Sequence, residues 1–99
     1  MRITDIKILE GCLEGEYVRD ILFDGLITLE LINFFGNIGK TVIHNLEPKP
    51  FFTIIARGKY TIKGSIGNNS ERVIFPDKFA EIYLDEIFDM VNKFSLQST

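Results

Sequence analysis

The stretch that decides the fold is residues 51–76, FFTIIARGKYTIKGSIGNNSERVIFP, which is rich in β-branched and aromatic residues and interrupted by turn residues. Gly58-Lys59 suits a two-residue hairpin turn with glycine at its first central position. Residues 67–70, GNNS, supply a second turn signal. The segment therefore predicts three antiparallel strands near 51–57, 60–66 and 71–76.

The two turns also predict which side chains share a face of the sheet. The first turn pairs Ile55 with Ile62, and the second pairs Ile62 with Phe75. The face expected to contact the C-terminal helix then carries Phe51, Ile55, Ile62, Val73 and Phe75. The opposite face carries Phe52, Ile54, Ala56 and Ile74 beside Thr61, Lys63 and Arg72.

That opposite face is a candidate interface, because an apolar patch rimmed with bases is typical of an interaction surface. It is too apolar to be simply hydrated, yet its bases need water or a partner. We expect it to be covered either by the first helix or by another molecule. The predicted interface residues are Phe52, Ile54, Lys63, Arg72 and Ile74.

Upstream of this segment, residues 2–9 and 16–23 predict a hairpin. Residues 28–36 predict a helix with Thr28 as its N-cap. A strand over 40–46 follows, and the prolines of EPKP then form a rigid connection.

Downstream, the apolar spacing of residues 77–94 predicts a second helix, with Asp77 as its N-cap and a frayed tail over 95–99. Along one side of this helix, Glu81, Asp85 and Asp89 are read as a solvated face. The expected order is ββ-α-β-βββ-α. The sequence thus predicts one α+β domain over 1–99, a small sandwich with a largely antiparallel sheet and two helices, the C-terminal one packed on the sheet.

Composition narrows the class of protein. The chain has 99 residues, of which 45% are hydrophobic and 25% charged, and this favours a globular protein over a disordered one. A net charge of -3 and a pI near 5.1 disfavour nucleic acid as a partner. No run approaches the roughly 20 apolar residues of a membrane span, and the amino terminus does not resemble a signal peptide. We therefore expect a cytoplasmic protein with no membrane partner.

Gly39-Lys40-Thr41 has the three residues that close a phosphate-binding loop. That loop needs a glycine five positions before Gly39, where this chain has Phe34. It must also lead from a strand into a helix, and the predicted order here is the reverse. The alternative is that Gly36 and Gly39 end a helix, and that the positive charge of Lys40 interacts favourably with the carbonyl groups at the C-terminus of that helix. This is the interpretation we adopt.

No residue pattern predicts catalysis or a cofactor. His44 is the single histidine and Cys12 the single cysteine, and neither has a partner at an informative spacing. A structural role is the commoner one for such residues. An enzyme would need one of them in a site shared between subunits, which is the weakest hypothesis.

The charge is segregated along the chain. Residues 40–63 contain five bases and one acid. Such a stretch suits an anionic ligand, although ordinary solvated charge is the alternative. The candidate ligand-binding residues are Lys40, His44, Arg57 and Lys59.

Our leading hypothesis is a small non-catalytic binding or assembly module that binds a protein partner or itself, as a homodimer through a sheet face. The alternative is a binder of an anionic small molecule that uses the basic stretch from Lys40 to Lys63.

Overall fold

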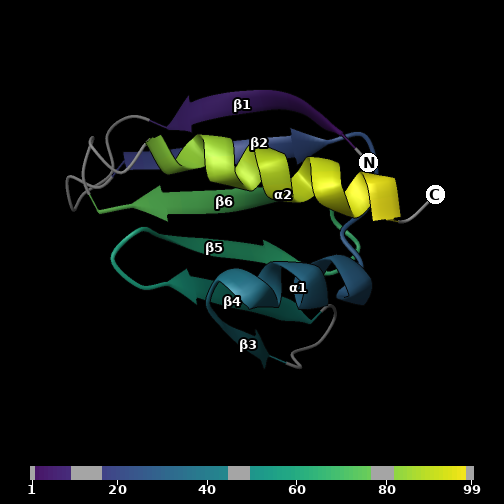
Figure 1. Ribbon diagram of the computed structural model, residues 1–99. Helices are drawn as coiled ribbons and strands as arrows, with labels where there is room; N and C mark the ends of the chain where they lie inside the picture. Colours follow the sequence, from purple (N-terminus) through teal and green to yellow (C-terminus); the bar gives the residue numbers. More distant parts are fainter. Residues whose placement is uncertain (1, 10–16, 45–49, 77–81, 98–99) are drawn as a thin grey trace.

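One six-stranded antiparallel sheet organises the molecule, in the order β1-β2-β6-β5-β4-β3 (Figure 1). The computed structural model describes residues 2–9, 17–44, 50–76 and 82–97. The strands are β1 (Ile3–Leu9), β2 (Tyr17–Phe23), β3 (Lys40–His44), β4 (Phe51–Ala56), β5 (Tyr60–Ser65) and β6 (Ser70–Phe75). The predicted order ββ-α-β-βββ-α and the α+β class are confirmed.

Both α-helices lie on the same face of the sheet (Figure 1). Helix α1 (Leu29–Phe35) continues into a short 3₁₀ turn, η1 (Gly36–Ile38), and lies over the β4 side. Helix α2 (Leu84–Gln97) lies over β2 and β6. The fold therefore has two layers, and the hydrophobic core lies between them.

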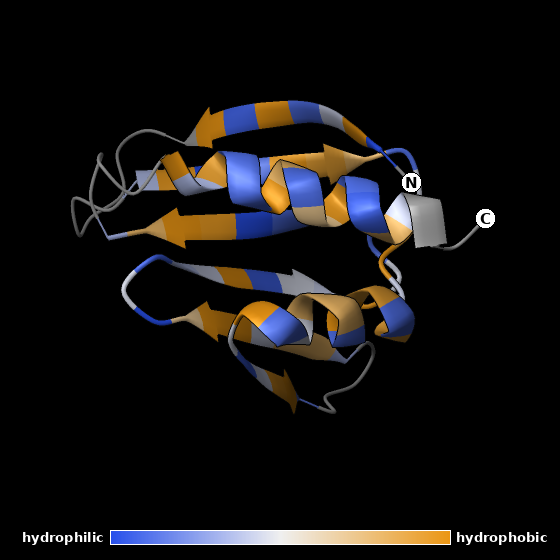
Figure 2. Ribbon diagram, in the orientation of Figure 1, coloured by the Kyte–Doolittle hydropathy of each residue, from blue (hydrophilic) through white to orange (hydrophobic). Residues whose placement is uncertain are grey.

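The core is built from alternate residues of the central strands, as period-two patterning requires. Figure 2 shows hydrophobic and hydrophilic residues in alternating bands along the strands and along α2. The fully buried side chains from the sheet are Ile21, Phe52, Ile54, Ile62, Val73 and Phe75. Those from the helices are Leu31, Ile32, Phe35, Ile87 and Val91.

The segment around Gly39-Lys40-Thr41 connects α1 and the following 3₁₀ turn to β3. The Thr28 Oγ1 caps α1 by accepting a hydrogen bond from the Leu31 N–H at 3.2 Å. At the other end the strand begins at Lys40. Gly39 is needed for close approach, because a Cβ there would lie 2.1 Å from the carbonyl oxygen of Ile55. A helix precedes the tripeptide and a strand follows it, which is the reverse of a phosphate-binding loop.

The predicted register of β4 was wrong by one residue. The β4–β5 turn contains three residues, 57–59, rather than two. Gly58 takes a φ of 80° at its centre, and the Lys59 N–H donates to the Ala56 carbonyl at 2.9 Å. The positive φ belongs to Gly58 at the second position of the loop. Arg57 is therefore the first residue of the loop rather than the last residue of β4. Ile54 therefore pairs with Ile62, and Ile55 does not.

This shift exchanges the two faces of β4, since successive side chains of a strand point in opposite directions. Phe52 and Ile54, predicted on the interface, are 1% and 0% exposed in the core. Phe51 and Ile55, predicted in the core, lie on the other face. The β5–β6 register differs from the prediction by two residues, with Ile62 opposite Val73. An even shift preserves the faces, so Ile62, Val73 and Phe75 lie in the core as predicted.

Helix α2 extends to Gln97, past the start of the tail predicted over 95–99. Its inward side chains include Ile87 and Val91, while Asp85 and Asp89 are exposed. Asp77 and Glu81 lie outside the described residues. Among the residues that are described, no helix is long and apolar enough to cross a membrane.

Candidate functional site

The sheet face turned away from both helices is the candidate site, and we call it the open face. Across it, strand pairing aligns one row of side chains from β1 to β3. In spatial order this row is Lys7, Asp20, Arg72, Lys63, Thr53 and Val42. The row is centred on charged residues, and most of its charge is positive.

Asp20 and Arg72 form an ion pair within this row. The Arg72 Nε donates to Asp20 Oδ1 at 2.9 Å, and its Nη2 donates to Oδ2 at 3.4 Å. On the other side of Arg72, Lys63 lies directly opposite it on β5. Like charges at directly opposed positions destabilise a sheet. Within the described residues, the Lys63 ammonium has no ion-pair partner.

The rows on either side combine apolar and polar residues. One contains Val18, Ile74, Thr61, Ile55 and Lys40. Within it, Ile55 is 41% exposed. In the other row, the His44 ring stacks on Phe51 with the ring centroids 4.4 Å apart. The open face therefore offers apolar contact area beside its bases.

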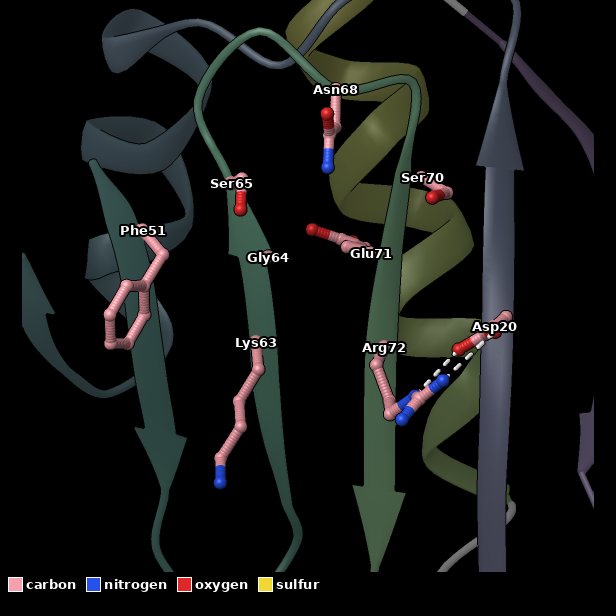
Figure 3. A pocket seen from close by; sticks show the side chains of 9 residues that line it. All are labelled: Asp20, Phe51, Lys63, Gly64, Ser65, Asn68, Ser70, Glu71 and Arg72. Carbon is pink, nitrogen blue, oxygen red and sulfur yellow. Dashed lines mark hydrogen bonds and ion pairs between the residues drawn. The ribbon is translucent and has the colours of Figure 1, made fainter. Parts of the chain in front are cut away.

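A groove of about 350 Å³ lies at the centre of the open face, between β5 and β6 (Figure 3). Its lining residues are Asp20, Phe51, Lys63, Gly64, Ser65, Asn68, Ser70, Glu71 and Arg72. Figure 3 shows Lys63 and Arg72 toward one end of the groove, with Ser65, Asn68 and Ser70 toward the other. The groove thus has a charged end and a neutral polar end.

Glu71 is buried beside the groove without a partner. The residue is 3% exposed, and neither carboxyl oxygen accepts or donates a hydrogen bond. Burial raises the pKa of this carboxyl to about 8. A Cβ at Gly64 would lie 3.0 Å from the Phe52 ring and 3.3 Å from the Glu71 Cβ. The glycine therefore makes room for both side chains.

Our reading of the sequence missed Glu71, although the alternation of β6 contained the signal. In SERVIF, Glu71 falls on the same side as Val73 and Phe75, which were predicted to be core residues. A carboxyl group on the same face of a strand as two core residues indicates either a buried acid or a strand that begins or ends between them.

Lys59 belongs to a contact between the sheet and α2. Its Nζ lies 3.2 Å from Glu86 Oε1 and 5.2 Å from the centroid of the Tyr83 ring. The buried Tyr60 hydroxyl donates to Glu86 Oε2 at 3.1 Å. Burial, followed by the nearby Glu86 carboxylate, raises the pKa of Tyr60 above its usual range. These contacts hold α2 against the β4–β5 turn.

The four predicted ligand-binding residues do not converge. Lys40 and His44 occupy opposite ends of β3, about 13 Å apart along the strand. Arg57 is exposed in the β4–β5 turn, and Lys59 contacts α2. Lys63, Arg72 and Ile74, predicted at an interface, do lie together on the open face.

Metal ligands are not clustered in the described ranges, where no three His, Cys, Asp or Glu side chains are placed to hold an ion. Cys12 lies outside those ranges. Comparison with known proteins finds no matching family model, no matching curated protein and no matching solved structure.

Proposed function

We propose that this protein is a small non-catalytic binding module that docks an acidic protein surface on its open face. The observation that carries the proposal is the placement of both helices on one side of the sheet. The other side presents the exposed Ile55 among basic side chains. Exposed apolar area beside polar groups is the usual composition of a protein-binding surface.

Charge selects the kind of partner. Among the described strand residues, the open face carries four bases, Lys7, Lys40, Lys63 and Arg72, and two acids, Asp5 and Asp20. The formal charge of these strand residues is thus +2 (four bases minus two acids). Opposite potentials favour encounter, and like charges brought together oppose it. This charge favours an acidic partner.

Self-association is the second form of the same proposal. A symmetric pairing of two open faces would use the same surface on both copies. If its axis ran near the centre of the sheet, it would bring Lys63 and Arg72 close to their own counterparts. Charge therefore ranks a second copy below an acidic partner protein.

Two surface variants test the proposal. Ile55→Glu places an acid on the open face, whereas Leu29→Glu changes a similarly exposed residue, 49% exposed, at the start of α1. Affinity capture with cross-linking should identify an acidic protein that contacts the open face. We expect Ile55→Glu to lose this protein and Leu29→Glu to retain it.

The oligomeric state is measured in parallel by light scattering at micromolar concentration. A dimer that Ile55→Glu alone converts to a monomer would establish self-association through the open face. Equal retention of every captured protein by both variants, together with a monomeric wild type, would refute the proposal.

A further inference from the structure

The central groove contains two basic residues, and a carboxylate balances the charge of only one of them in the described part of the chain. Lys63 and Arg72 are directly opposed across β5 and β6. Asp20 pairs with Arg72 and so holds its guanidinium in place on the β2 side. Lys63 has no such carboxylate in the described part of the chain. Figure 3 shows the two side chains directed apart, with the Arg72 guanidinium turned toward Asp20. An anion beside Lys63 would supply the counter-charge that its ammonium lacks.

The other end of the groove supplies neutral hydrogen-bonding groups. Figure 3 shows the Asn68 amide directed into the space between β5 and β6, with Ser65 and Ser70 on either side. Among the described residues, these three side chains make no hydrogen bond to one another or to other groups. Two hydroxyls and an amide both donate and accept. They therefore suit the hydroxyl groups of a polar ligand.

Glu71 does not oppose an anion at neutral pH. Its carboxyl oxygens are buried beside the groove rather than exposed in it. Because burial raises the pKa of Glu71 to about 8, the group is mostly protonated and uncharged at neutral pH. The ion-pair contribution to an anion therefore comes from Lys63, with Arg72 adding positive potential beside it.

We propose that the groove binds a small phosphorylated polyol, with its phosphoryl group against Lys63 and its hydroxyls against Ser65, Asn68 and Ser70. The volume of about 350 Å³ is within the range of small-molecule sites. Phe51 borders the groove and offers an apolar edge to the carbon skeleton. This inference does not depend on a protein partner, because a free ligand would bind to the isolated chain.

The experiment is a titration of the ¹⁵N-labelled protein with glucose 6-phosphate, inorganic phosphate and glucose at constant ionic strength. We expect saturable amide shifts in residues 63–72 with both phosphates, and stronger binding of the sugar phosphate. Lys63→Gln should weaken both phosphates about tenfold, the scale of one charge-assisted hydrogen bond. Ser65→Ala combined with Ser70→Ala should bring the affinity for the sugar phosphate closer to that for inorganic phosphate, with the Asn68 amide left in place.

Lys40→Gln is the matched control, because Lys40 is an exposed lysine of the same face that does not line the groove. We expect its affinities to equal those of the wild type. If Lys40→Gln and Lys63→Gln weaken binding equally, the attraction is general and the site is refuted. Absence of localised shifts with either phosphate, at concentrations up to the millimolar range, would also refute it. The spectrum of each variant shows directly whether its fold is retained.

Discussion

Replacing Glu71 by glutamine should stabilise the protein at neutral pH and change how its stability depends on pH. The pKa of this carboxyl rises from 4.5 to about 8 in the folded chain, and each pKa unit is equivalent to about 1.4 kcal/mol. Between those two values the folded chain holds a proton that the unfolded chain has released. The free energy of unfolding therefore falls as pH rises through this window, because the stability present below pH 4.5 is lost.

The size of the effect follows from the same two pKa values. At about pH 7 the protonation difference costs the wild type about 3 kcal/mol, and above about pH 8 the cost approaches about 5 kcal/mol. Glutamine cannot ionise, so the variant avoids this cost. Its buried amide and the protonated carboxyl both lack partners, and an unsatisfied polar group costs about 1–3 kcal/mol in either case. The net gain at neutral pH should therefore approach 3 kcal/mol but not exceed it by much.

The assay is urea unfolding followed by circular dichroism at about pH 5, 7 and 8.5. The difference between the two proteins isolates Glu71, because every other titrating group is common to both. Glu30→Gln is the control: Glu30 is exposed in the first turn of α1, and its replacement should cost less than about 1 kcal/mol through the lost interaction with the helix dipole. Identical pH dependence of the wild type and Glu71→Gln would refute the reasoning, as would a variant less stable than the wild type at about pH 8.5.

Four further substitutions test the fold by the same denaturation assay. Ile54→Glu should unfold the protein, at a cost above about 4 kcal/mol, while Ile55→Glu should cost less than about 1 kcal/mol; equal effects would contradict the β4 register. Gly39→Ala should destabilise the protein by about 3 kcal/mol, because the new Cβ would overlap the Ile55 carbonyl. A variant as stable as the wild type would show that β3 and β4 separate easily. Thr28→Ala should cost about 1 kcal/mol through loss of the α1 cap, whereas no change would mean that the Leu31 N–H finds water instead.

Only part of the candidate site was predictable. Lys63, Arg72 and Ile74 were placed together correctly, since strand alternation is a local property of β5 and β6. Their ion-pair context was not predictable, because Asp20 lies 52 residues before Arg72 in the chain. The polar end of the groove was missed as well. Ser65, Asn68 and Ser70 look like ordinary turn residues until the strands on both sides are placed.

The sequence by itself determined the elements and their order, because hydrophobic period, caps and glycines act over a few neighbouring residues. Tertiary structure decided which face of each element is buried. The β4–β5 loop contains one residue more than the predicted two-residue turn, namely Arg57. Because the side chains of a strand alternate with a period of two, this single residue exchanges the buried and exposed faces of β4. The placement of both helices on one side of the sheet, and the burial of Glu71, likewise depend on contacts between residues far apart in the chain.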